Sequence, residues 1–151
     1  MFRRRLGVAT GCAMLAVGGP LLATAHAGDI DPALAAAMQG LDARETVSAL
    51  LYLEEQVDTV ALTDQFNLEK ASLRARHREV VESLRDTAVL TQGPLLQAIA
   101  ELAAKGQIEH HEAYWIVNAV RVDAPRAVIE RLARRDDVGI AYLNPEIELV
   151  A

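Results

Sequence analysis

The sequence is poor in cysteine and in aromatic residues. Its one cysteine is Cys12, and only 4% of its 151 residues are aromatic. A chain with a single cysteine forms no intramolecular disulfide, so its fold depends on a hydrophobic core. Enough apolar material is present, because 52% of the residues are hydrophobic, mainly alanine, leucine and valine. The length is that of one domain.

The N-terminal segment, residues 1–27, lacks acidic residues altogether. Arg3-Arg4-Arg5 precede an apolar, small-residue stretch over 6–25, and Ala25-His26-Ala27 ends it with the small-x-small pattern of a cleavage site. Gly18-Gly19-Pro20 interrupts an already short apolar run. We therefore interpret the segment as a secretory signal peptide rather than a transmembrane helix, and we expect a secreted or periplasmic protein.

Positive charge is scarce in the remainder of the chain. Residues 28–151 contain 12 basic and 21 acidic residues, a net charge of −9. An acidic chain is a poor ligand for nucleic acid or anionic lipid, so we expect neither partner after removal of the leader. Cys12 leaves with that leader. Twin-arginine export and lipidation at Cys12 are weaker alternatives, because the residues around both motifs match poorly.

A recognisable catalytic motif is also lacking. The three serines of residues 28–151, Ser48, Ser72 and Ser83, have no nucleophile-elbow context. His110-His111 lies between two glutamates, but adjacent residues of an extended segment point to opposite faces and no further ligand follows at metal spacing. No glycine-rich phosphate loop occurs. We therefore expect a protein that is not an enzyme and has no metal or other cofactor.

The hydrophobic pattern predicts a domain over residues 46–151, preceded by a linker over 28–45 that contains a short helix. That helix is expected from Asp31 as N-cap through Pro32 to a stop at Gly40. A helical pattern over 58–105 is expected to break or kink at Gly93-Pro94, because proline removes a helical donor. The predicted elements of the domain are a strand at 46–53, helices at 58–92 and 94–104, strands at 112–117 and 119–123, a helix from about 125 to 135, and a strand at 138–143.

This order predicts an α+β, ferredoxin-like βαββαβ fold. We expect a four-stranded antiparallel sheet with two helices on one face and an extended, kinked first helix. The predicted strands barely alternate between apolar and polar residues: Leu50 and Tyr52, for example, oppose Leu51 and Leu53. Both faces of the sheet are therefore expected to be apolar, which favours a partner protein over the open face. The alternative is that the long helical region wraps around both faces.

Residues 114–148 (YWIVNAVRVDAPRAVIERLARRDDVGIAYLNPEIE) resemble the second half of subtilisin-type propeptides. The shared features are a strand pair, a short helix of the form V-I-E-x-L-A, an Asp-containing turn, a final strand and an extended tail. The strand segment Ala49–Leu53 and the helix segment Val80–Leu84 fit the same type. The likeness covers roughly residues 46–151 and is greatest to bacillopeptidase F-type prodomains.

The resemblance implies a partner, a subtilisin-like serine protease, for which the chain would be a secreted inhibitor or folding chaperone. In such prodomains the open sheet face docks on two parallel surface helices of the protease, and the tail lies in the substrate cleft as a bound product. The corresponding tail here is Glu148, Leu149, Val150 and Ala151, with Ala151 in the primary specificity position. Asn144 and Glu146 fall where the family has carboxylates that cap the protease helices, although Asn144 replaces the commoner acidic residue.

Two other interpretations stay open at this point. Since the catalytic Asp, His and Ser motifs of a protease do not follow the tail, the chain is either a free-standing inhibitor or the separated N-terminal pre-pro region of a protease precursor. A third interpretation is an exported homodimeric interaction module that associates through the same apolar sheet face.

Overall fold

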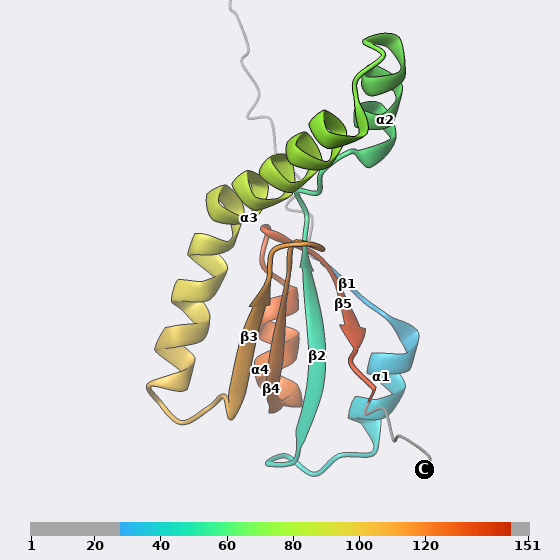
Figure 1. The fold of residues 1–151 in the computed structure, drawn as a ribbon. Coiled ribbons are helices and arrows are strands. Elements are labelled where there is room, and N and C mark those ends of the chain that lie inside the picture. The colour runs from blue at the N-terminus through green and yellow to red at the C-terminus, as the bar shows by residue number, and fades with distance from the viewer. Residues whose placement is uncertain (1–27, 146–151) are drawn as a thin grey trace, which may run out of the picture.

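The computed structural model describes residues 28–145, which form a five-stranded sheet with helices around it (Figure 1). The predicted signal peptide and the tail from Glu146 onward lie outside these residues. None of the helices between Gly28 and Pro145 is long and apolar enough to cross a membrane. In chain order the elements are β1 (Asp29–Ile30), α1 (Pro32–Gln39), β2 (Thr46–Leu53), α2 (Thr59–Leu68), α3 (Leu73–Ala103), β3 (His110–Tyr114), β4 (Ala119–Pro125), α4 (Arg126–Ala133) and β5 (Val138–Leu143).

The sheet has the strand order β1-β5-β2-β4-β3. Strands β2 to β5 pair in antiparallel fashion, whereas β1 pairs in parallel with β5. The predicted α+β class is confirmed, but the prediction of a four-stranded, all-antiparallel sheet is wrong because the sheet is five-stranded and mixed. The additional strand is only two residues long, too short for a periodic pattern, and the N–H of Asp31 extends its pairing by donating to Ala141 O at 2.9 Å.

The short helix predicted between Asp31 and Gly40 is present as α1. The Asp31 carboxylate accepts the N–H of Ala33 at 2.9 Å, as an N-cap does, and proline occupies the first helical turn. Leu34 and Met38 of α1 are buried in the main core. Residues 28–45, expected as a linker, thus supply both a strand and a core helix.

Of the break or kink predicted at Gly93-Pro94, the break is wrong, because α3 runs through both residues without interruption. A proline inside a helix removes one hydrogen bond and bends the axis, which need not end the helix. Figure 1 shows α3 changing direction about halfway along its length. The break instead comes before α3, where Lys70 has φ 50° and Ser72 caps the new helix by accepting the N–H of Ala75.

Because of this bend, the two halves of α3 have different surroundings. The second half contributes Leu95, Ile99 and Leu102 to the core. The first half pairs with α2 in a helical hairpin, here called the arm, that projects beyond the end of the sheet (Figure 1). Within the arm Phe66 is buried, and the Arg76 guanidinium lies 5.9 Å from its ring centroid.

The strand predicted at 112–117 begins and ends earlier, as β3. Tyr114 pairs with Ala119, so residues 115–118 form the loop of the β3–β4 hairpin. The loop closes at Asn118, whose φ of 40° lies in the left-handed region that asparagine tolerates better than most residues. Strong β formers therefore lie in a turn, and Ile116 is exposed there.

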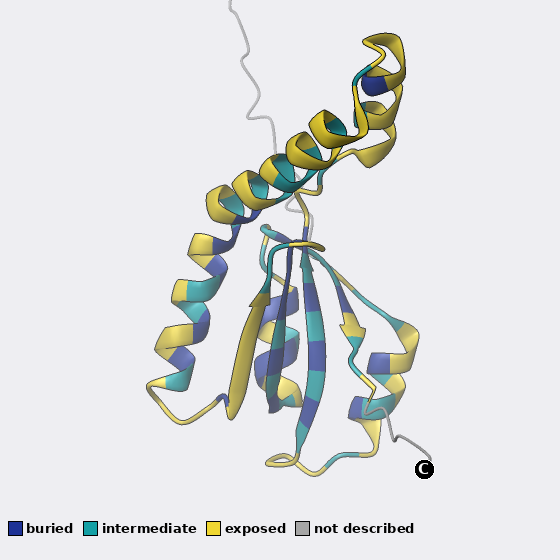
Figure 2. Cartoon of the chain, viewed as in Figure 1, coloured by how far each residue is buried: buried dark blue, intermediate teal, exposed yellow. Residues whose placement is uncertain are grey.

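The core lies on one face of the sheet, between the strands and the helices α1, α3 and α4 (Figure 2). Every second residue of β2 is buried, and the alternate residues are partly exposed. This alternation assigns each face of the sheet unambiguously. The fully buried large side chains are Leu34, Leu51, Leu53, Leu95, Ile99, Val120, Val122, Ile129, Leu132 and Val138.

Candidate functional site on the open sheet face

The face of the sheet opposite the core is not crossed by any helix of residues 28–145 (Figure 1). We call it the open face. Its members follow from the strand registers, because residues paired directly across antiparallel strands share a face. Three cross-strand rows result: His110, Asp123, Ser48 and Asn144; Glu112, Arg121, Leu50 and Tyr142; and Tyr114, Ala119, Tyr52 and Ile140.

The half of the open face formed by β2 and β5 is apolar. Leu50, Tyr52 and Ile140 are partly exposed, and Tyr142 retains 40% of its surface in solvent. The rings of Tyr52 and Tyr142 meet edge to face, with centroids 5.4 Å apart and an interplanar angle of 84°. Aromatic pairs of this geometry are stabilised beyond the area that they bury. This half therefore offers a rigid apolar surface.

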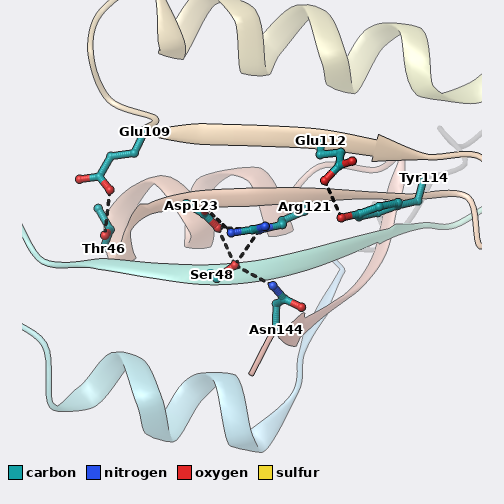
Figure 3. A network of polar contacts seen from close by, with 8 residues as sticks. All are labelled: Thr46, Ser48, Glu109, Glu112, Tyr114, Arg121, Asp123 and Asn144. Atoms are coloured by element: carbon teal, nitrogen blue, oxygen red, sulfur yellow. Dashed lines mark hydrogen bonds and ion pairs between the residues drawn. The ribbon is translucent and has the colours of Figure 1, made fainter. Parts of the chain in front are cut away.

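The other half of the open face, where β4 lies beside β2, carries a polar cluster around Ser48 of β2 (Figure 3). The Ser48 hydroxyl donates to Asp123 Oδ1 at 2.5 Å and accepts from Arg121 Nε at 3.2 Å. Arg121 also forms a bidentate pair with Asp123, at 3.1 Å through Nε and 2.7 Å through a terminal nitrogen. Such forked contacts fix the position of both side chains.

Further polar contacts extend this cluster to the edges of the sheet (Figure 3). Asn144 Nδ2 donates to Ser48 Oγ at 3.0 Å, and the backbone N–H of Asn144 donates to the Ser48 carbonyl at 3.0 Å. On β3 the Tyr114 hydroxyl donates to Glu112 Oε2 at 2.8 Å. The polar side chains of this face are therefore held in place before any partner arrives.

The contacts shift the proton affinities of the cluster. Burial by itself raises the pKa of Asp123, but the hydrogen bond from Ser48 and the ion pair with Arg121 outweigh burial and hold that pKa below its ordinary value. The hydrogen bond to Asp123 raises the pKa of Arg121. The hydrogen bond to Glu112 raises the pKa of Tyr114, because a phenol that donates to a carboxylate gives up its proton less readily.

The lowered pKa predicts how the stability of the domain depends on acid. Because the folded-state pKa of Asp123 is below the unfolded value of about 3.9, its contribution is present above that value and is lost as pH falls through the folded pKa. We expect Arg121→Gln to raise the Asp123 pKa toward the ordinary value. Carboxyl NMR titration measures the Asp123 midpoint in the unmodified chain and in Arg121→Gln. Arg126→Gln is the control, because Arg126 pairs with Glu130 on α4. An unchanged Asp123 midpoint in Arg121→Gln would contradict the assignment.

The chemistry of the cluster favours binding over covalent catalysis. Ser48 Oγ is engaged by Asp123, Arg121 and Asn144, and no histidine within residues 28–145 hydrogen-bonds to it. The carboxylate that accepts from Ser48 is a weak base, because the pKa of Asp123 is lowered, and a serine beside a weak base is a weak nucleophile. In the same part of the chain, no group of three or more His, Cys, Asp or Glu is arranged to hold a metal ion.

The structure places only one of the residues predicted to form a site. Asn144 lies at the end of β5 with its side chain turned onto Ser48. Glu146, Glu148, Leu149, Val150 and Ala151 lie outside the described residues. The expectation of two apolar faces holds for the β2–β5 half and is wrong for the β4 half.

The polar cluster was missed at the level of sequence, although a signal for it exists. In β4, Arg121 and Asp123 alternate with the buried residues Val120, Val122 and Ala124. This alternation is typical of a strand with one face in the core and one facing out. The other two members of the cluster, Ser48 and Asn144, come from distant strands, and only the register brings them together.

Comparison with known proteins yields no assignment: no protein family, no curated protein and no solved structure matches this chain.

Proposed function

We propose that the exported chain binds a subtilisin-like serine protease, as an inhibitor or as a folding chaperone, through the open face and the C-terminal tail. The observation that carries the proposal is that no helix of residues 28–145 covers the open face and that half of this face is apolar. Apolar surface left uncovered on a soluble domain marks an interaction site more often than not. Tyr142 is the most exposed residue of the apolar half.

The end of β5 and the sequence of the tail support the same partner. The N–H of Asn144 bonds to the Ser48 carbonyl, so the chain is still attached to β2 where β5 ends. The residues that follow, Glu146 to Ala151, alternate acidic and apolar side chains at first and end in three apolar ones. A segment of this sequence suits main-chain pairing in a substrate cleft, with side-chain pockets for specificity. One protease surface can therefore contact the face and the tail together.

The topology is also compatible with the proposed class. Strands β2 to β5 have the order β5-β2-β4-β3 and are antiparallel. The connections through α3 and α4 are those of a split βαβ unit. We propose that these four strands are a ferredoxin-like core to which β1 has been added at the edge.

Removal of the tail tests the proposal. We expect residues 28–151 to inhibit a secreted subtilisin-like protease with saturable, stoichiometric kinetics. Loss of Glu148–Ala151 should weaken the inhibition constant at least about 30-fold, because two or more net hydrogen bonds of about 1 kcal/mol each are lost. Hydrolysis of a small peptide substrate is the readout, and a chain with Val60→Asp on the arm is the control.

Other results of the same titration identify the alternatives. A folded chain that does not inhibit, and that light scattering shows to be a dimer, would favour the homodimeric module. A chain that is disordered by circular dichroism, and that folds only when a protease is added, would favour the separated precursor region. Equal inhibition with and without the tail would contradict the product-like mode of binding.

A further inference from the structure

The backbone of Gly28, the first described residue, is packed against two carbonyl oxygens. A Cβ at this position would lie 2.6 Å from Ala133 O and closer still to Val138 O. Real carbon atoms do not approach carbonyl oxygens so closely, and both oxygens belong to backbone that cannot easily move aside. The main chain of Gly28 therefore occupies a site that admits no side chain.

The Ala133 carbonyl is the last one of α4. Ala133 is fully buried. The N–H group of Arg135 donates to Leu132 O at 3.2 Å instead. Among residues 29–145 no other N–H group or side chain donates to Ala133 O. A buried carbonyl without a donor is costly, so the adjacent Gly28 nitrogen is its natural partner.

The sequence predicts that the leader is cleaved at the peptide bond to this nitrogen. Hydrolysis of the Ala27–Gly28 peptide adds water, leaves a carboxylate on Ala27 and releases Gly28 with a free amino group. This group takes up a proton and becomes an ammonium with three donors. The C-terminal end of a helix carries partial negative charge and attracts cations. We propose that the new ammonium of Gly28 binds at the C-terminal end of α4, so that removal of the leader completes the fold.

The surrounding charges leave room for this cation. Arg134 pairs at 3.5 Å with Glu130, which Arg126 also contacts, and Arg135 pairs with Asp137 at 2.6 Å, so both neighbouring guanidinium groups already contact a carboxylate. Arg131 points to Gln107, 3.4 Å away. The remaining charged groups on β1, the α4–β5 turn and the end of β2 are all acidic: Asp29, Asp136 and Glu54.

The proposal predicts an order of events as well as a contact. Beside Gly28, β1 is paired with β5, and α4 covers the same end of the core. A protease needs an extended, accessible segment around the bond that it cuts. Cleavage therefore precedes the docking of β1, and the uncleaved chain lacks the ammonium contact.

The test compares two chains that are identical over residues 28–151, one with a free Gly28 amine and one acetylated there. We expect the amine pKa, measured by NMR on labelled Gly28, to be about one unit above the usual value of 7.7–8.0. A raised folded-state pKa gives stability that is present below the unfolded value and is lost as pH rises through the folded value. The unfolding constant of the free chain should therefore rise about tenfold between pH 6 and pH 10. The unfolding constant of the acetylated chain should not show this tenfold rise. Other groups titrate in both chains, so their contribution cancels when the two chains are compared.

A third chain that retains Ala27 is a second neutral control, because its Gly28 nitrogen, like that of the acetylated chain, is an amide that donates one hydrogen bond and carries no charge. It should behave like the acetylated chain with pH. Gly28→Ala should destabilise every form by its clash, whereas Gly40→Ala, where a Cβ meets nothing within 4 Å, should not. If the free amine titrates at its ordinary value and acetylation leaves the unfolding constant unchanged, the proposal is wrong. These results do not depend on whether the chain binds a protease.

Discussion

The substitution Asn118→Ala is expected to lower the free energy of unfolding by about 3 kcal/mol, a large share of the stability of a small domain. Asn118 is a polar residue with only 2% of its surface exposed. It lies at the end of the β3–β4 loop, where the hairpin, β2 and α3 meet. Its loss therefore affects three elements together.

The side chain of Asn118 satisfies groups from each of these elements. Its Nδ2 donates to the Glu55 carbonyl at 2.7 Å and to Thr91 Oγ1 at 2.9 Å. Its Oδ1 accepts from Nε2 of the buried Gln92 at 3.1 Å. Alanine would remove these three hydrogen bonds, each of which contributes about 1 kcal/mol. Gln92 Nε2 would retain only its bond to Tyr114 O at 3.2 Å. The buried network is thus stable only as a whole.

The backbone of Asn118 adds a second, separable cost. At φ 40° alanine is strained by about 1 kcal/mol, whereas glycine is not. Asn118→Gly should therefore lose the network but avoid the strain, and should be about 1 kcal/mol more stable than Asn118→Ala. Lys70→Gly is the matched control, because Lys70 has φ 50° but is exposed, and there glycine should be neutral or slightly stabilising.

Urea unfolding followed by circular dichroism measures all three variants. The slope of the transition should stay constant, so that midpoints report stability alone. A loss below about 1 kcal/mol in Asn118→Ala would mean that water replaces the side chain and that the network is not structural.

Much of the fold could be predicted because its signals are local. The N-cap of α1 at Asp31 and the apolar stripe of α4 each lie within a few residues of the element that they define. The alternation in β2 is equally local, and it identifies Val47, Ala49, Leu51 and Leu53 as the core face. Periodicity of this kind is the strongest signal that a single sequence contains.

The features that escaped prediction are decided by contacts between distant residues. Gly93-Pro94 has the composition of a helix break, but the buried Leu95 and Ile99 keep the second half of α3 on the core. Trp115 reads as a strand residue, yet the Arg85 guanidinium lies over its ring at 4.8 Å in the hairpin loop. Tertiary packing overrides local propensity in both cases.

The candidate site shows the same division. The apolar half of the open face could be read from β2 and β5, because its residues are consecutive in the alternation of each strand. The polar cluster depends on Ser48 lying opposite Asp123, which are 75 positions apart in the chain. A shift of one residue in the register would turn every one of these side chains to the other face. Such a contact follows from the register alone.

The open face itself gives the largest expected effect on binding. We expect Tyr142→Asp to weaken inhibition of a subtilisin-like protease by at least about 100-fold, because a charge would be buried where an aromatic residue contacted the partner. The domain should remain folded, because Tyr142 is 40% exposed and the pair that it forms with Tyr52 contributes only about 1 kcal/mol. The inhibition constant and the urea midpoint should therefore change to very different extents.

The matched control is Val60→Asp, which places the same charge at a residue that is 71% exposed on the arm, away from the sheet. It should leave both measurements unchanged. If Tyr142→Asp inhibits as well as the unmodified chain while removal of Glu148–Ala151 abolishes inhibition, the tail binds alone and the open face serves something else. If neither change matters, the chain is not an inhibitor of this protease class. Contact of one protease with both the face and the tail is supported only if Tyr142→Asp and the removal of Glu148–Ala151 each weaken inhibition while the domain stays folded.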